Sequence, residues 1–340
     1  MNKVTAYARL LRIPGLGGLG IPAVIGALTV GVQDLLSLVI LFIIGSLSAI
    51  YGFILNDYAD VDLDRLIKEL KGKPLVDGTI ELKSAVFVCF LCAMFAFFFL
   101  FLLWHGKTLD EFKFIALTSI VLAGILGSIY DVYGKKFVGS DFLVAISMAF
   151  IFLLGATSFG APVTITWIIF ILTFNQILHM NAVEGGIKDA DHDYLMGVKN
   201  IALVSGVKVE GDNLFIPLRF KAFGMGIRLC SAFLVFTPFI FFKDQLKYYA
   251  SWQPIIIAVL AVATFGVLFF SVKLLSLKTF DRDAIRKYIG IQSFLRYSLV
   301  PIMLIPIIGI IPGVILVFFP IVWYIIFTPL LGEKLLRPRM

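Results

Sequence analysis

Long apolar stretches, separated by short polar segments, follow one another along almost the whole chain. A stretch of about 17–25 apolar residues has the length that a helix needs to cross a lipid bilayer. Such stretches are found at residues 14–32, 36–55, 84–104, 112–130, 141–159, 163–182, 226–243, 253–274 and 299–327. The first is rich in glycine and the last in proline, so we expect neither to be a straight helix. The pattern predicts an all-α polytopic membrane protein with nine transmembrane helices.

The composition leads to the same class of protein. The 340 residues are 60% apolar and 15% charged, with a mean hydropathy of +1.00, whereas an average soluble domain carries about 25% charged residues. A disordered chain would not hold so many large apolar side chains. Three cysteines make no disulfide framework, and the Cys89-x-x-Cys92 pair lies within an apolar stretch, which argues against a metal or redox site.

The basic residues predict the orientation of the helices. The net charge is +7, and most of the 29 Lys and Arg lie in the N-terminus and in the segments 56–83, 131–140, 183–225 and 275–298. By the positive-inside rule these segments face the cytoplasm and the C-terminal tail faces the other side, so the charge indicates a cell-membrane protein and no nucleic-acid partner. Four tryptophans near span ends would then form an outer interfacial belt: Trp104, Trp167, Trp252 and Trp323.

Two of the cytoplasmic segments are acidic. Each contains the pattern Asp-x-Asp-x-Asp, at residues 60–64 after the second helix and at residues 189–193 after the sixth. The distance of four helices between them suggests an internal repeat in which the two acidic segments face each other across a cavity. If the helix continues past Asn56, the side chains of Asp57, Asp60 and Asp64 lie on one face with it, and Asp189 and Asp193 make a similar pair.

Carboxylates at these spacings repel one another and require a cation to offset their charge. Carboxylate and amide oxygens suit Mg²⁺ or Ca²⁺ better than Zn²⁺. A calcium loop of the EF-hand type needs Gly at position 6 and an acid at position 12. Those positions are Arg65 and Lys71 in the first segment, and Tyr194 and Asn200 in the second. An ion path across the membrane would place acids near the middle of the spans, and a plain solvated acidic loop remains an alternative.

Basic side chains alternate with the acids at this end of the spans. Lys73 and Arg65 follow the first acidic segment, Lys188 precedes the second, and Lys135 and Lys136 follow the fourth helix. Because Mg²⁺ commonly bridges carboxylates to phosphates, acids and bases together suit a diphosphate. The apolar interior of the protein could then hold a lipid tail. Taken singly, each lysine also fits an ordinary basic cytoplasmic loop.

These motifs resemble those of the UbiA superfamily of intramembrane prenyltransferases over about residues 10–330. Asn56-Asp57-x-x-Asp60-x-x-x-Asp64 resembles the first aspartate motif of the family, and Asp189-x-x-x-Asp193 resembles the second. Lys73-Pro74-Leu75 is similar to its basic-Pro-Leu segment, although Arg is more usual at the first position. Tyr130 through Lys136 is similar to the Tyr/Lys segment after the fourth helix.

The resemblance implies a single transmembrane domain over residues 1–340, with a central cavity and cytoplasmic cap loops at about 56–83, 131–140 and 183–225. Its activity would be the transfer of an isoprenyl group from a prenyl diphosphate to a lipophilic or aromatic acceptor, with two or more Mg²⁺ ions. The implied metal ligands are Asn56, Asp57, Asp60, Asp64, Asp189 and Asp193. The implied diphosphate contacts are Lys73, Lys135, Lys136, Lys188, Arg65 and Asn56. Tyr130 or Tyr133 would lie near the allylic carbon, where an aromatic face stabilises a cation.

Several features leave the acceptor open. Arg12-Ile13-Pro14-Gly15 departs from the Arg-Pro start of many aromatic-acceptor members, so a quinone precursor, a glycerophosphate lipid and haem all remain. Asn175 and Asn181 could line the acceptor pocket or bond neighbouring helices, and His192 could lie near the metals. Residues 207–216 alternate around Gly-Asp-Asn and predict a short hairpin, either capping the site or forming a surface ribbon.

Two further expectations concern the whole protein. A long prenyl chain is most stable in hydrocarbon, so we expect the cavity to open sideways to lipid, flanked by the glycine-rich first span and the proline-rich last span. The alternative from another class is a membrane transporter or lipid-binding protein with the same cavity. Magnesium-dependent release of diphosphate would distinguish the enzyme from this alternative.

Overall fold

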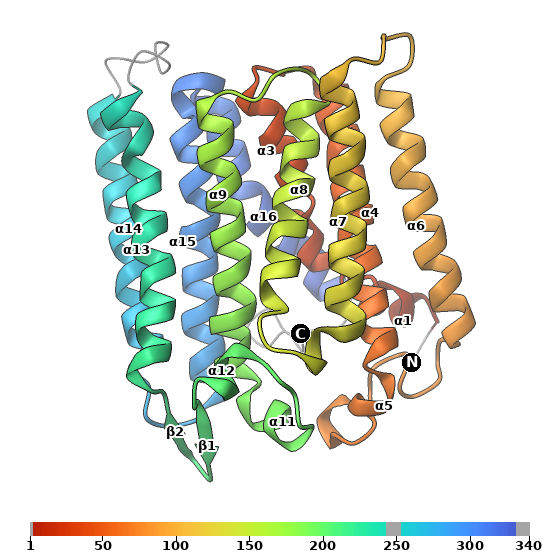
Figure 1. Ribbon diagram of the computed structural model, residues 1–340, viewed down its shortest axis with the longest axis vertical. Coiled ribbons are helices and arrows are strands. Elements are labelled where there is room, and N and C mark those ends of the chain that lie inside the picture. The colour runs from red at the N-terminus through yellow and green to blue at the C-terminus, as the bar shows by residue number, and fades with distance from the viewer. Residues whose placement is uncertain (1–2, 243–252, 331–340) are drawn as a thin grey trace. The chain divides into compact units, whose positions relative to one another are not determined.

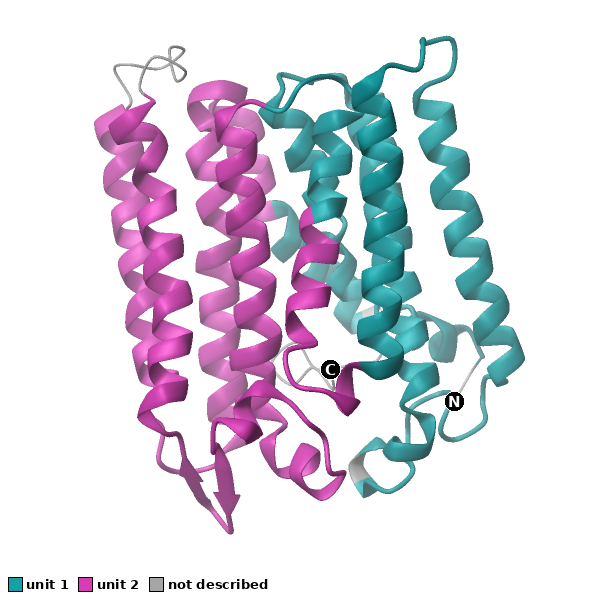
Figure 2. Cartoon of the chain, in the orientation of Figure 1, with its two compact units in different colours: residues 1–133, 150–162, 319–340 teal, residues 134–149, 163–318 magenta. Residues whose placement is uncertain are grey.

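The computed structural model describes residues 3–242 and 253–330, and its secondary structure is almost entirely helical (Figure 1). Within those residues, nine helices are long and apolar enough to cross a membrane, and α8 (Asp141–Thr157) is a shorter apolar helix. The chain forms two compact units (Figure 2). Unit 1 is Met1–Tyr133, Phe150–Pro162 and Phe319–Met340, and unit 2 is Gly134–Ala149 and Val163–Phe318. Whether they act as the predicted single domain stays a prediction.

Unit 1 contains the first four predicted spans. Its helices are α1 (Lys3–Leu10), η1 (Ile13–Gly15), α2 (Leu16–Leu19), α3 (Ile21–Thr29), α4 (Leu35–Ala59), α5 (Val61–Asp64), η2 (Lys68–Leu70), α6 (Leu82–Leu103) and α7 (Glu111–Tyr133). The first span is broken into short helices, as its glycines predict. Arg12, before η1, adopts a left-handed conformation with φ of 46°, and Asp34 caps α4 by accepting a hydrogen bond from the backbone N–H of Ser37.

A small apolar core holds the end of α4 that carries the first acidic segment. Ile54 before that segment and Val61 within it are buried with Leu75 and Ile80 from the following loop and with Ala85 from α6. The backbone N–H of Ile80 donates to the carbonyl of Pro74 and closes the loop. The loop between α4 and α6 is therefore fixed in place by burial rather than free in solvent.

Unit 2 contains the predicted spans 163–182, 226–243 and 253–274, whereas α8 and α16 are divided between the two units. Its helices are η3 (Gly134–Lys136), α9 (Thr164–Leu178), η4 (His179–Gly185), α10 (Gly186–Lys188), α11 (Ala190–Leu195), α12 (Ile201–Val204), α13 (Leu218–Phe241), α14 (Gln253–Leu275) and α15 (Arg282–Ile308). The predicted hairpin is confirmed as strands β1 (Lys208–Glu210) and β2 (Asn213–Phe215), paired antiparallel. Gly211 takes φ of 58° in its turn. The hairpin also bonds to the loop after α14, because the Leu214 N–H donates to the Lys278 carbonyl.

A second core holds the acidic segment of unit 2. Val183, Ile187 and Ala190, around that segment, are buried with Leu214 of the hairpin and Ile285 of α15. The η4 segment between α9 and α10 is a π-helix of seven residues. Such a segment is uncommon and is frequent at functional sites.

The sequence predicted one last span over 299–327 that its prolines could kink or break, and the structure shows a break and wider bounds. The chain forms two helices there, α15 and α16 (Ile310–Leu330), joined at Gly309, which takes φ of 94°. Most of the predicted loop 275–298 is therefore helix. Asp281 caps α15 by accepting hydrogen bonds from the backbone N–H groups of Asp283 and Ala284. The first turns of α15 contain charged residues, so the sequence shows no continuous apolar stretch over this part of the helix.

The last helix packs onto the first span within unit 1. The Trp323 Nε1–H donates to the Ile13 carbonyl at 2.8 Å, and the Trp323 ring occupies the space that a side chain at Gly17 would need. The first and last spans are thus in contact near Ile13 and Gly17. The sequence had predicted that these two spans flank an opening to lipid. Trp323 also lies against the start of the first span rather than at the predicted outer interface. Trp252 and the C-terminal tail lie outside the described residues.

Candidate active site

Three carboxylates are buried together in unit 1 at the end of α4. Asp57, Asp60 and Asp64 are 6%, 7% and 2% exposed, whereas the side chain of Asp62 is 92% exposed. The helical spacing that the sequence predicted is present, since the Asp60 N–H donates to the Asn56 carbonyl and the Asp64 N–H donates to the Asp60 carbonyl. The local spacing therefore turns three acids inward and leaves Asp62 in solvent.

Two cations neutralise part of this charge. Lys73 Nζ lies 3.0 Å from Asp57 Oδ1 and 2.7 Å from Asp64 Oδ2, and Arg12 Nη2 lies 2.9 Å from Asp57 Oδ1. Burial alone would lower the pKa of Lys73, but the carboxylates of Asp57 and Asp64 outweigh it and hold that pKa above its ordinary value of 10.5. Lys73 is therefore charged at neutral pH, and its contribution to these ion pairs is lost as the pH rises through this raised pKa.

A fourth carboxylate, Asp131, comes from α7. A hydrogen bond of 2.9 Å between the hydroxyl groups of Tyr51 and Ser128 joins α4 to α7, and a side chain at Gly52 would lie 3.5 Å from Asp131 Oδ2. Asp131 interacts repulsively with Asp60 and attractively with Arg12. The three motif carboxylates already outnumber the two cations, so the site carries net negative charge before Asp131 is counted.

The acidic segment of unit 2 is more exposed and is held by different partners. Lys188 Nζ lies 3.3 Å from Asp189 Oδ2, and Asn200 Nδ2 donates to Asp193 Oδ2 at 2.7 Å. Arg282 Nη2 bonds to Asp191 Oδ1 at 2.6 Å and lies 3.0 Å from His192 Nε2. Asp191 and His192 are thus occupied by α15, which leaves Asp189 as the most exposed acid of the motif that carries an ion pair.

A buried polar cluster lies behind this segment, among the helices of unit 2. Glu184 Oε1 accepts hydrogen bonds at 2.7 Å from both Arg228 of α13 and Arg296 of α15. Arg228 also donates to Ser271 and Gln292. All of these side chains are buried. The sequence motifs described above do not include this cluster. Arg228 was its signal, because a charged residue within the predicted span 226–243 is uncommon and points to function.

Comparison with known families decides the relationship. A model of the UbiA prenyltransferase family matches residues 19–299 of the chain. The chain belongs to the UbiA prenyltransferase family. The match ends within α15, so α16 lies beyond the part of the chain that the family model describes.

Curated relatives of the UbiA family are similar over most of their own length. A 4-hydroxybenzoate octaprenyltransferase from Francisella tularensis subsp. mediasiatica is 26% identical over 234 residues, which are 63% of this chain and 77% of that protein. The corresponding enzyme from Shewanella frigidimarina is 26% identical over 210 residues, which are 60% of this chain and 70% of that protein. These relatives agree with an intramembrane prenyltransferase.

Solved structures agree with the fold. A structure described for digeranylgeranylglyceryl phosphate synthase matches with a TM-score of 0.62 and 20% identity, over 91% of this chain and all of that one. A UbiA homologue from Archaeoglobus fulgidus, bound to GPP and Mg²⁺, matches with a TM-score of 0.60 and 19% identity, over 90% of this chain and all of that one. The polytopic helical fold predicted from the sequence is therefore confirmed.

The remaining predicted UbiA site residues lie in different surroundings. Tyr130 and Tyr133 belong to α7 in unit 1, and Tyr133 is exposed. Lys135 and Lys136 belong to η3 in unit 2, where the Lys135 carbonyl accepts from the Lys199 N–H beyond the second acidic segment. This bond ties the predicted Lys segment to the neighbourhood of Asp193.

Other candidates have simple structural partners. Arg65 pairs with the exposed Asp62 at 2.9 Å, not with the buried acids. Asn175 Nδ2 donates to Cys230 Sγ across α9 and α13, as expected for a residue that bonds neighbouring helices. Asn181 donates to the Ile177 carbonyl of its own helix. The described contacts of these three residues are structural.

The donor set of the first acidic segment fits Mg²⁺ by its chemistry. The ligands available are the carboxylates of Asp57, Asp60 and Asp64 with the amide of Asn56, all hard oxygen donors with excess negative charge. Among the described residues, no three His, Cys, Asp or Glu side chains converge into a ready-made metal cage.

Proposed function

We propose that this protein transfers an isoprenyl group from a prenyl diphosphate to a lipophilic or aromatic acceptor within the membrane and releases diphosphate. The observation that carries the proposal is the buried group of Asp57, Asp60 and Asp64 with Lys73 and Arg12. Three carboxylates and two cations, held by a core at the end of two apolar spans, suit a polyanion bound through metal ions. Family membership supports the same reaction.

Magnesium would be held by Asn56, Asp57, Asp60 and Asp64 in unit 1 and by Asp189 and Asp193 in unit 2. When bound, Mg²⁺ stabilises the negative charge that builds on the leaving diphosphate. Two or more ions are proposed because two separate carboxylate segments are present. The A. fulgidus homologue bound to GPP and Mg²⁺ supports the use of this metal.

The chain's own cations would bind and orient the diphosphate. Lys73 bonds to Asp57 and Asp64 in the structure and would contact a diphosphate oxygen when substrate is bound. Lys135, Lys136 and Lys188 are proposed as further diphosphate contacts. Tyr130 or Tyr133 would face the allylic carbon. The apolar spans around the site exclude water, which protects an allylic cation from hydrolysis.

The acceptor is proposed to be a quinone precursor, with a glycerophosphate lipid as the second candidate. Curated relatives named as 4-hydroxybenzoate octaprenyltransferases favour the first, and the structural match to digeranylgeranylglyceryl phosphate synthase favours the second. Arg12 bonds to Asp57 and packs on the Phe53 ring, 4.8 Å from its centroid. Arg12 therefore serves the diphosphate end of the site in this proposal rather than an acceptor carboxylate.

The test is prenyl transfer by the purified protein with Mg²⁺, followed by product extraction and assay of released diphosphate. We expect Asp60→Asn and Asp189→Asn each to abolish transfer and to leave the protein monodisperse, because these carboxylates hold metal and do not pack the fold. Asp62→Asn is the matched control, since Asp62 belongs to the same segment but is exposed and pairs only with Arg65. Wild-type turnover by either monodisperse Asn variant contradicts the proposal.

The same assay separates the enzyme from a transporter or lipid-binding protein. Prenyl diphosphate that binds without Mg²⁺-dependent release of diphosphate, across a panel of aromatic and glycerophosphate acceptors, would favour the non-enzymatic alternative. The protein is proposed to lie in the cell membrane with both acidic segments in the cytoplasm. Accessibility of single cysteines at Tyr58 and Tyr194, both exposed beside these segments, to a membrane-impermeant reagent in inverted vesicles tests that orientation.

A further inference from the structure

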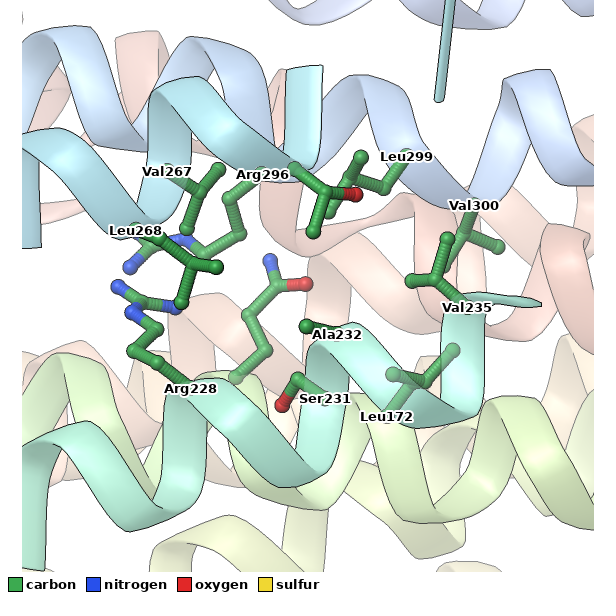
Figure 3. A pocket seen from close by; sticks show the side chains of 12 residues that line it. Leu172, Arg228, Ser231, Ala232, Val235, Val267, Leu268, Arg296, Leu299 and Val300 are labelled. Atoms are coloured by element: carbon green, nitrogen blue, oxygen red, sulfur yellow. The ribbon is translucent and has the colours of Figure 1, made fainter. Parts of the chain in front are cut away.

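The interior of unit 2 contains a small, partly open cavity that none of the proposed catalytic residues lines. Its volume is about 30 Å³. The cavity lies among α9, α13, α14 and α15, and its wall includes Arg228, Ala232, Thr264, Leu268 and Arg296. Figure 3 shows the guanidinium groups of Arg228 and Arg296 together at one end of the cavity and apolar side chains around the other.

The polar end carries more positive than negative charge. Arg228 and Arg296 are each 3% exposed, and both bond to the same oxygen of Glu184, which is 1% exposed. The other side chains to which they donate hydrogen bonds, Ser271, Gln292 and Ser293, are neutral. One carboxylate therefore faces two guanidinium groups. A buried charge without a counter-ion is costly, so this arrangement favours a bound monoanion.

Buried polar atoms without a hydrogen-bond partner also indicate a ligand at the polar end of the cavity. Arg296 Nε and Thr264 Oγ1 are buried without a hydrogen-bond partner, and both residues line the cavity. Gln292 Nε2 and Glu184 Oε2 in the same cluster also lack partners. Buried polar groups are almost always satisfied by protein, water or ligand. The donors at the cavity wall suit an anionic oxygen, and water can serve the remaining atoms.

The cavity volume limits the size of the anionic group. A volume of about 30 Å³ accommodates about two water molecules, which matches a carboxylate. A diphosphate does not fit. The polar end is therefore separate in its chemistry from the diphosphate site proposed above.

An apolar groove adjoins the cavity and suits a hydrocarbon chain. It has a volume of about 480 Å³, and it shares Ala232, Thr264 and Leu268 with the cavity wall. Its other lining residues are Phe233, Phe236, Ile240, Ala261 and Phe265, all from α13 and α14. A cationic polar end and a continuous apolar groove are together complementary to an amphiphile with one negative charge.

We propose that unit 2 binds a long-chain monocarboxylate, with its carboxylate at Arg228 and Arg296 and its alkyl chain in the groove between α13 and α14. The carboxylate supplies the missing negative charge, and its chain replaces lipid against the phenylalanine side chains of the groove. This binding does not depend on prenyl transfer.

Equilibrium binding of radiolabelled palmitate to the protein in neutral-lipid nanodiscs tests the proposal. We expect saturable binding to one site, which unlabelled palmitate displaces and methyl palmitate does not, because the ester carries no charge. Sodium bromide tests whether a small anion without an alkyl chain binds at the same site. Saturable binding of bromide without binding of palmitate would overturn the proposal, as would equal competition by the methyl ester.

Three variants locate the site. Arg296→Gln leaves one guanidinium against Glu184. We expect the affinity for palmitate to fall by at least about tenfold. Thr264→Val keeps the side-chain shape and removes a donor, and Ala232→Phe fills the junction between cavity and groove without changing charge. Val259→Phe on the exposed face of α14 is the matched control. If Arg296→Gln does not fold, palmitate binding by Thr264→Val and Ala232→Phe tests the site. Wild-type affinity in both variants would contradict the proposal.

Discussion

At the scale of one residue, Lys73 neutralises part of the carboxylate charge of the site when no metal is bound. It is the shared partner of Asp57 and Asp64, both buried. We expect Lys73→Met to lower the free energy of unfolding by about 2 kcal/mol in the absence of Mg²⁺, less than the ~3–5 kcal/mol of a fully buried pair, because 28% of the Lys73 side chain is exposed. Thermal unfolding in detergent measures this change.

Magnesium provides the second part of the same prediction. Because a bound cation replaces the lost charge of Lys73, Mg²⁺ should raise the unfolding temperature of Lys73→Met more than that of the wild type. Lys71→Met, at an exposed neighbouring position, is the control and should behave as the wild type. An equal rise in unfolding temperature with Mg²⁺ in wild type and Lys73→Met would show that the metal does not replace the charge of Lys73.

Glu184 is the second residue whose substitution has a clear expected effect. It is the shared carboxylate of Arg228 and Arg296. We expect Glu184→Gln to lower the free energy of unfolding by about 3–5 kcal/mol, because it leaves two guanidinium groups buried without a counter-ion. Glu210→Gln on the exposed hairpin is the control, expected within about 0.5 kcal/mol of the wild type. A loss below about 1 kcal/mol for Glu184→Gln contradicts this account of the cluster.

At the scale of the element, α16 acts on the first span through one side chain. Trp323 bonds to the carbonyl of Ile13, next to Arg12, and Arg12 reaches Asp57 from a left-handed backbone conformation. We expect Trp323→Phe, which removes the hydrogen bond, to cost about 1 kcal/mol of stability. Trp323→Ala should cost about 2–3 kcal/mol, less than the ~3–5 kcal/mol of a core Trp because Trp323 is only partly buried. It should also lower kcat/KM, because Arg12 is no longer held beside the acids.

The control for this pair is Trp167→Phe, at a half-exposed position on α9. Unfolding in detergent and steady-state prenyl transfer give the two readouts. Unchanged kcat/KM in a folded Trp323→Ala variant would show that α16 only stabilises the first span and has no effect on Arg12.

At the scale of the whole molecule, the two acidic segments are predicted to hold one diphosphate. The prediction places the Asp60 and Asp189 carboxylates within about 15 Å of each other when substrate and metals are bound. Spin labels at Tyr58 and Tyr194 should show a shorter and narrower distance distribution when prenyl diphosphate and Mg²⁺ are added together. The same labels in an Asp60→Asn background are the control and should not respond. No response in the wild-type background contradicts the shared site.

The sequence alone determined the features that depend on short-range pattern. Span lengths follow from the bilayer thickness and from runs of apolar residues. The inward face of Asp57, Asp60 and Asp64 follows from a spacing of three and four residues on a helix, and the 207–216 hairpin follows from alternation around a Gly-Asp-Asn turn. The motifs also led to the UbiA family, which the family model confirms.

Tertiary structure decided every feature that joins residues distant in the chain. Arg12 meets Asp57 across 45 residues, Arg296 meets Glu184 across 112, and Trp323 meets Ile13 across 310. No periodicity encodes these pairs, because each depends on how whole helices pack. The sequence left open whether the proline-rich last span is kinked or broken. The structure shows a break at Gly309 and two helices. Local spacing thus set which side chains face inward, and helix packing set which partners they meet.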